Sequence, residues 1–220
     1  MIAVQAASNG NSSGTSIAKA FTGSVTAGSC LVAALGLWTS GTLTGNTPTL
    51  TDSLGNTWTF VGRTTQNSNN FNSEAYLFVC FNSQGGGDTV TATYSYGGNV
   101  HAELIILEYG IAATATDGSA FINNNSAITG CTTSPFSTAV GGDHLIAFAF
   151  ETADTSDTLT MATSGYTQEA THATDSTLVV WAQTGFSGSV TINVTGTHAS
   201  ILHCGVVALP GVPQSIQLFP

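Results

Sequence analysis

The chain carries few charged side chains. Charged residues make up 6% of its 220 residues, against about 25% in ordinary soluble domains. Only Lys19 and Arg63 are basic, while 12 residues are acidic, which gives a formal net charge of −10. Because proteins hold nucleic acids largely through lysine and arginine contacts to phosphates, we expect no nucleic-acid partner. The same charge balance disfavours binding to an anionic membrane surface.

The chain also lacks a long apolar segment. No run approaches the ~18–20 residues of a membrane-spanning helix. Residues 1–5 have no basic stretch ahead of their apolar residues, so the start does not resemble a secretory signal. The polar but nearly uncharged composition nevertheless suits an extracellular setting. We therefore expect a location on a virion surface or outside the cell, because a virion protein is released without a signal peptide.

Cysteine is scarce as well, since four residues are too few for a scaffold built on disulfides. Cys80 and Cys204 lie inside apolar segments, where a free thiol behaves as a small hydrophobic side chain. Cys30 and Cys131 stand at the starts of such segments and could be paired. We expect mainly buried, unreactive thiols.

No segment shows a helical period with capping residues. Short apolar runs alternate instead with glycine, asparagine and serine turns at intervals of eight to twelve residues. This pattern predicts an all-β fold, an antiparallel β-sandwich of jelly-roll type. Residues 31–38, a short apolar run bounded by turn residues, predict a strand buried on both faces.

That buried run recurs further along the chain. Residues 31–38 are matched by residues 145–150, and each copy follows a glycine and two polar residues. Three further segments repeat: 76–81 as 177–182, 88–93 as 188–193, and 105–110 as 206–211. The spacing is 114 residues at the first strand and 101 at the last, so the first half has 13 extra residues, between Trp38 and Tyr76.

A period near 100 residues is far longer than that of solenoid repeats. It predicts an internal duplication, with halves 1–110 and 111–211 forming one domain around a common core. Residues 212–220 fall outside the repeat as an apolar tail.

The segment Asp52-Ser53-Leu54-Gly55-Asn56-Thr57-Trp58 predicts two short strands joined at Gly55 and Asn56. In the second half Ser164-Gly165-Tyr166 takes its place, with Tyr166 where the first half has Trp58. Together with residues 31–38 and 108–110, the segment resembles a duplicated β-sandwich module of phage virion proteins and bacterial surface proteins. The resemblance covers most of residues 25–211, implies a structural or adhesive role and assigns no catalytic residue.

The sequence shows no recognisable arrangement of catalytic or metal-binding residues. A hydrolase needs a nucleophile with a base and an orienting acid, and the five histidines stand at no recognisable spacing from serine and aspartate. Asp154, Asp157 and Asp175 could converge on Ca²⁺, although their spacing matches no known loop. We predict no enzyme activity, no cofactor and no metal.

Two functional hypotheses follow. The first is a non-enzymatic structural protein on the exterior of a virion, a capsid-decorating or tail-associated subunit that docks on other subunits and forms a homo-oligomer. Its docking residues would be Ile216, Leu218 and Phe219 in the tail. The alternative is an extracellular carbohydrate-binding or adhesin module, with Trp58 stacking on a sugar ring and Asn56 and Asp52 forming hydrogen bonds to the glycan. Trp38 and Trp181 are weaker candidates for that platform.

Overall fold

The computed structural model describes residues 2–39, 41, 47–67, 72–96, 99–124, 126–139, 141–152 and 157–211. Within these ranges the chain forms β-strands and no helix, and every pair of neighbouring strands is antiparallel. The prediction of an all-β, sandwich-like antiparallel fold is therefore confirmed. The predicted docking residues Ile216, Leu218 and Phe219 lie outside the described residues.

The first half of the chain builds one five-stranded and one three-stranded sheet. The larger sheet has the order β1-β8-β3-β6-β5, and the smaller has the order β2-β7-β4. Their strands, in chain order, are β1 (Gln5–Asn11), β2 (Ser16–Ala20), β3 (Cys30–Thr39), β4 (Thr49–Asp52), β5 (Trp58–Asn67), β6 (Asn72–Cys80), β7 (Thr89–Thr93) and β8 (Val100–Tyr109).

The second half builds a corresponding pair of layers. Its five-stranded sheet has the order β14-β15-β12-β18-β9, and its outer layer consists of β10-β17-β13 with the short pair β11-β16. These strands are β9 (Ser119–Ile122), β10 (Ile128–Thr132), β11 (Phe136–Ser137), β12 (Asp143–Glu151), β13 (Thr160–Met161), β14 (Thr167–Ala173), β15 (Thr177–Phe186), β16 (Ser189–Val190), β17 (Asn193–Ser200) and β18 (Leu202–Leu209).

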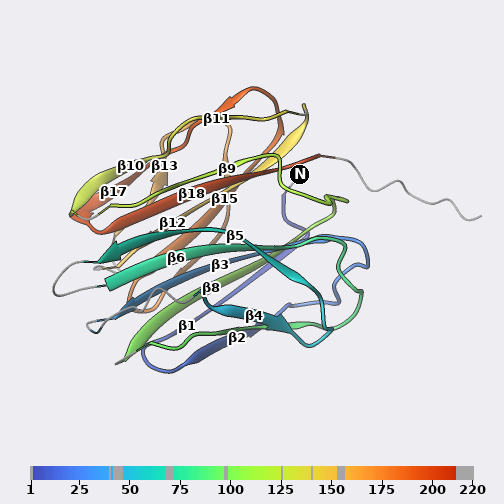
Figure 1. The fold of residues 1–220 in the computed structure, drawn as a ribbon, viewed down its shortest axis with the longest axis horizontal. Helices are drawn as coiled ribbons and strands as arrows, with labels where there is room; N and C mark the ends of the chain where they lie inside the picture. The colour runs from blue at the N-terminus through green and yellow to red at the C-terminus, as the bar shows by residue number, and fades with distance from the viewer. Residues whose placement is uncertain are drawn as a thin grey trace, which may run out of the picture.

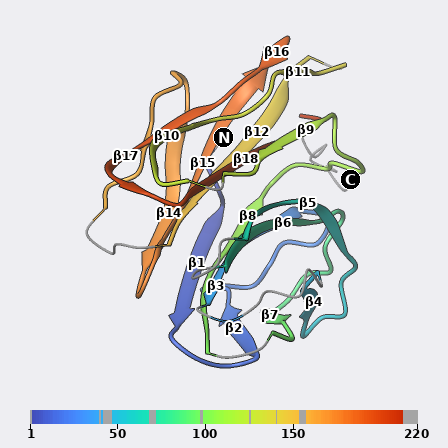
Figure 2. The same ribbon diagram turned by 60° about the vertical axis from the view of Figure 1, so that its left-hand side comes forward.

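The sheets stack as four layers, with the two five-stranded sheets face to face in the middle (Figures 1 and 2). In this stack β1 lies beside β14, and β5 lies beside β9. Written from its first strand, the larger sheet of the second half reads β9-β18-β12-β15-β14, which matches β1-β8-β3-β6-β5 strand for strand in chain order. The two halves therefore share one strand order in their inner sheets.

Three hydrophobic clusters fill the spaces between the four layers, rather than one common core. The first lies between the two sheets of the first half, and the third lies between the layers of the second half. The central cluster draws residues from both five-stranded sheets, among them Val32 and Ile105 from one half and Phe148 and Val207 from the other.

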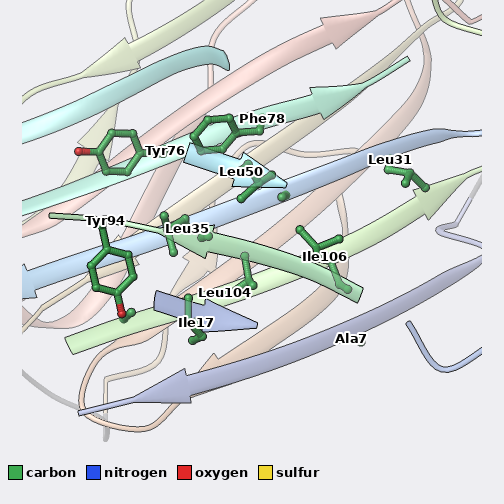
Figure 3. Packing of buried hydrophobic residues seen from close by; sticks show 14 of the residues in the cluster. Ala7, Ile17, Leu31, Leu35, Leu50, Tyr76, Phe78, Tyr94, Leu104 and Ile106 are labelled. Atoms are coloured by element: carbon green, nitrogen blue, oxygen red, sulfur yellow. The ribbon is translucent and has the colours of Figure 1, made fainter. Parts of the chain in front are cut away.

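The reason for three clusters is that the inner strands are buried on both faces. Along β3, Leu31, Ala33 and Leu35 enter the first cluster, whereas Val32 and Ala34 enter the central one. Figure 3 shows Leu31 and Leu35 in the first cluster, which the outer strands β2, β4 and β7 help to enclose. Since side chains alternate across a strand, a strand between two sheets is expected to be apolar at most of its positions. The expectation that residues 31–38 form such a strand is confirmed.

Candidate functional site

The segment from Asp52 to Trp58 turns a corner between two layers; we call it the Trp58 corner. β4 ends at Asp52 and pairs with β7 in the outer sheet, whereas β5 begins at Trp58 and pairs with β6 in the inner sheet. Two strands joined through Gly55 and Asn56 are therefore present, as expected, but they lie in different sheets and do not pair with each other. Gly55 does have the positive φ of +73° expected of a turn glycine, but the chain there crosses to another sheet.

The side chain of Asp52 holds this corner together. Its Oδ1 accepts hydrogen bonds from the backbone N–H of Leu54 at 3.1 Å and of Asn56 at 2.9 Å. Its Oδ2 accepts the indole N–H of Trp58 at 2.8 Å. Asn56 Oδ1 in turn accepts the backbone N–H of Gln84 at 2.7 Å. A carboxylate that accepts several local N–H groups fixes a turn firmly, because each of these bonds is charge-assisted.

A second carboxylate and a thiol lie behind the corner. Asp88 Oδ1 accepts hydrogen bonds from the backbone N–H and the hydroxyl of Ser53. Burial raises the pKa of Asp88, and the nearby charge of Asp52 raises it further. Burial also raises the pKa of the Cys80 thiol to about 12, with smaller contributions from the same two carboxylates. A thiol with that pKa stays protonated at neutral pH and is a poor nucleophile.

The structure thus brings Asp52, Asn56 and Trp58 together, as the glycan hypothesis requires. Most of their polar groups bond within the chain, and the half-buried indole of Trp58 packs against the first hydrophobic cluster. Asn56 Nδ2 is buried without a hydrogen-bond partner among the described residues. The hydrogen bonds within the chain explain why Asp52, Asn56 and Trp58 occur together, since they stabilise the turn. Sugar binding by Trp58 stays a prediction.

The counterpart in the second half, which we call the Tyr166 corner, is built differently. Ser164, Gly165 and Tyr166 supply no carboxylate, and the hydroxyl of Tyr166 is buried without a hydrogen-bond partner among the described residues. Burial raises the pKa of this phenol, so it remains neutral. A hollow of roughly 240 Å³ opens at this corner, and the residues that line it are Leu145, Thr163, Ser164, Tyr166, Gln183, Phe186, Ser189, Val190 and Thr191.

Local backbone features shape the hollow. Gly165 has a φ of +93°, and a Cβ added there would lie 2.7 Å from Gln183 Nε2. The pairing of β12 with β15 shifts register between Asp143 and Leu145, next to the position where Leu145 faces Gln183. The pairing of β3 with β6 in the first half shows no such shift. A β-bulge changes the direction of side chains around it, and here it lies at the wall of the hollow.

A line of polar contacts joins the two halves. Glu103 on β8 is buried, accepts the backbone N–H of Thr174 at 3.0 Å and contacts His172 Nδ1 through its other oxygen. His101, two residues earlier, contacts Asp175 Oδ2 at 3.0 Å. Sequence reasoning missed Glu103, because its partners come from the other half, about 70 residues away.

A second contact between the halves involves a buried histidine. His203 Nε2 on β18 lies 2.7 Å from Ser73 Oγ on β6. Burial lowers the pKa of His203 to about 3, so the imidazole is neutral at pH 7. Phe150 stacks near its ring.

The three aspartates considered for Ca²⁺ do not form a site in the described part of the chain. Asp154 lies outside the described residues. Asp157 Oδ1 accepts the backbone N–H of Thr197 at 2.6 Å, whereas Asp175 contacts His101. No group of three or more histidine, cysteine, aspartate or glutamate side chains in the described ranges could hold a metal ion.

The expectation for Cys204 is wrong. Cys204 and Cys131 form a disulfide that joins β18 in the inner sheet to β10 in the outer layer. Apolar neighbours on β18 suggested a free thiol, but the sequence does not show that β10 lies over this strand. Cys30 and Cys80 are free and buried, and burial raises the pKa of each to about 12, as expected for unreactive thiols.

No family model, curated protein or solved structure matches the chain. No helix in the described ranges is long and apolar enough to cross a membrane.

Proposed function

We propose that the chain is a non-enzymatic structural subunit on the exterior of a virion, either capsid-decorating or tail-associated, which acts by docking on neighbouring subunits. Three features support this role: a four-layer body with a core between each pair of layers, two halves with the same inner strand order, and an exterior with few charges. The matching strand order also supports an origin by internal duplication of one β-sandwich unit, which is part of the proposal.

The observation that carries the proposal is the outward face of the β2-β7-β4 sheet, which we call the threonine face. Its cross-strand rows consist of small uncharged side chains: Ser16, Thr93 and Thr49 in one row, and Ala18, Thr91 and Thr51 in the next. Most of these side chains are exposed. Such a face can pack against a flat neighbour without removing a charge from water, which costs several kcal/mol per ion.

The size of the contact limits what this face does alone. Specific protein–protein contacts bury on the order of 1,200–2,000 Å² in total, more than two short rows of small side chains supply. We therefore propose that the threonine face and the 212–220 tail dock together on a capsid or tail subunit. Several copies of the chain would bind around the same capsid or tail subunit and contact one another there as a homo-oligomer.

The test is immunogold labelling of intact particles from the source, combined with sedimentation of the purified chain. The proposal predicts label on the outside of particles. It also predicts loss of particle binding in Thr91→Lys, which places a cation at the centre of the threonine face, but not in the exposed control Ser126→Lys. Unlabelled particles together with a purely monomeric chain would overturn the proposal.

The second candidate is the carbohydrate-binding or adhesin module. The half-buried Trp58 indole is the observation that keeps it open. A glycan array compares the intact chain with Trp58→Ala: saturable sugar binding that disappears in the variant would favour the adhesin. Binding that persists in Trp58→Ala would exclude Trp58 as the platform.

A further inference from the structure

We propose that the hollow at the Tyr166 corner is a binding site for one ring of a neutral sugar. This site is separate from the threonine face and from Trp58, and it does not depend on the docking role proposed above. A cavity, two aromatic side chains and a buried hydroxyl without a partner among the described residues coincide there.

The first argument is the state of the Tyr166 hydroxyl. Its oxygen is buried and has no hydrogen-bond partner among the described residues. Leaving a buried hydroxyl unpaired costs roughly 1–3 kcal/mol. A ligand that draws this hydroxyl toward the hollow recovers that cost, so Tyr166 favours a ligand that can both donate and accept hydrogen bonds.

The second argument is the composition of the lining. Tyr166 and Phe186 supply aromatic rings, and Gln183 supplies an amide with two donors and one acceptor. The exposed residues Ser164 and Ser189 add hydroxyls. An aromatic surface beside amides and hydroxyls suits a sugar ring, whose C–H face packs on the aromatic ring while its hydroxyls bond to the amide and hydroxyl groups.

Charge and size narrow the ligand class. None of the described lining residues is Asp, Glu, Lys or Arg. The hollow therefore offers no counter-charge to an anionic or cationic sugar, and a neutral ligand avoids the cost of an unpaired charge. Its volume of roughly 240 Å³ lies below the ~300–1,000 Å³ of pockets for drug-sized ligands. One ring fits these limits better than an oligosaccharide held along its length.

The first half supplies an internal comparison. At the Trp58 corner, Asp52 accepts hydrogen bonds from the indole N–H of Trp58 and from two backbone N–H groups. At the Tyr166 corner Ser164, Gly165 and Tyr166 supply no carboxylate, and a register shift lies beside Leu145 in the wall of the hollow. The second half has an aromatic residue at this position whose hydroxyl lacks a partner among the residues described, and such a polar group is open to a ligand.

The experiment uses the full chain and saturation-transfer NMR with glucose, galactose and N-acetylglucosamine as separate probes. We expect saturable binding of at least one probe, with a dissociation constant in the millimolar range because the site is small and open. Tyr166→Phe, which removes only the hydroxyl, should weaken binding about five- to tenfold.

Two further variants control for folding and location. Gln183→Glu places a negative charge in the lining and should also weaken binding, whereas Tyr94→Phe changes a tyrosine of the first half and should leave binding unchanged. Each variant is checked for a native far-UV spectrum and thermal transition. No saturable binding of any probe, or unchanged binding in both folded Tyr166→Phe and Gln183→Glu, would overturn the inference. Neither result would bear on particle docking by the threonine face.

Discussion

The Trp58 corner and the Tyr166 corner occupy the same position in two halves that share a strand order. The first is held by hydrogen bonds to a carboxylate, whereas the second has no such carboxylate and borders a hollow. In the first half Asp52 accepts three N–H groups, including the indole of Trp58. In the second half the hydroxyl of Tyr166 has no hydrogen-bond partner within the described part of the chain, and Tyr166 lines a hollow. The comparison teaches that the same inner strands form beside either kind of corner, because the buried inner strands are continuous in both halves.

A second difference gives the second half a cross-link that the first half lacks. The second half is cross-linked between its layers by Cys131 and Cys204, whereas the first half keeps Cys30 and Cys80 as free thiols. We infer that the disulfide offsets the fastening that the Tyr166 corner lacks. The predictions below test this division, from the largest expected effect to the smallest.

The disulfide should make the largest single contribution. Replacing both Cys131 and Cys204 by alanine should lower the free energy of unfolding by about 4 kcal/mol, because the bond closes a loop of 73 residues in the unfolded chain. Denaturant unfolding with and without dithiothreitol measures the effect. Reductant should destabilise the intact chain and leave the double variant unchanged. An intact chain that does not respond to reductant would show that the bond is not formed.

Loss of the Asp52 carboxylate should have the next largest effect. Asp52→Ala should lower the free energy of unfolding by about 2–3 kcal/mol, because three N–H groups lose their acceptor in a half-buried site. The matched change in the second half, Ser164→Ala, should stay within about 0.5 kcal/mol. Equal losses in the two variants, measured by urea unfolding, would remove the distinction between the corners.

The buried histidine predicts a loss of stability in acid. Burial lowers the folded-state pKa of His203 from 6.5 to about 3, so between these values the unfolded chain binds a proton that the folded chain does not. The stability present above pH 6.5 is therefore lost as the pH falls, by about 1 kcal/mol per pH unit. His203→Asn should flatten this slope, whereas His198→Gln at an exposed site should keep it. If His203→Asn lost stability with falling pH as steeply as the wild type, a group other than His203 would cause the acid sensitivity.

The smallest effects compare the two aromatic residues directly. Trp58→Phe should destabilise the fold by about 1–2 kcal/mol, because Asp52 Oδ2 loses its donor. Tyr166→Phe should change stability by less than about 0.5 kcal/mol or raise it, since it removes a buried hydroxyl that no described residue bonds. Thermal unfolding of the two variants distinguishes these outcomes. A larger loss in Tyr166→Phe than in Trp58→Phe would reverse the comparison.

Much of the frame could be predicted from the sequence, because the relevant signals are local. The apolar run at residues 31–38 requires burial on both faces, and its recurrence at 145–150 predicts a second such strand. The division into three hydrophobic clusters could not be predicted. It depends on which sheets lie against one another, and strand alternation is the same for one core or three.

The candidate site was less accessible to sequence reasoning. The motif from Asp52 to Trp58 was found, but the crossing between sheets was missed because Gly55 and Asn56 suit a hairpin equally well. The hollow depends on Gln183 and Phe186 meeting Tyr166 across strands and on a register shift, neither of which leaves a local pattern. The pairing of Cys131 with Cys204 was missed for the same reason, since it joins two layers.

One measurement tests the division between the corners most directly: an NMR titration of the full chain with neutral monosaccharides that follows the Trp58 indole N–H and the Tyr166 ring together. The account predicts that the Tyr166 ring signals shift saturably while the Trp58 indole N–H, held by Asp52, stays in place and exchanges slowly with solvent. A saturable shift of the Trp58 indole with no change at Tyr166 would contradict it.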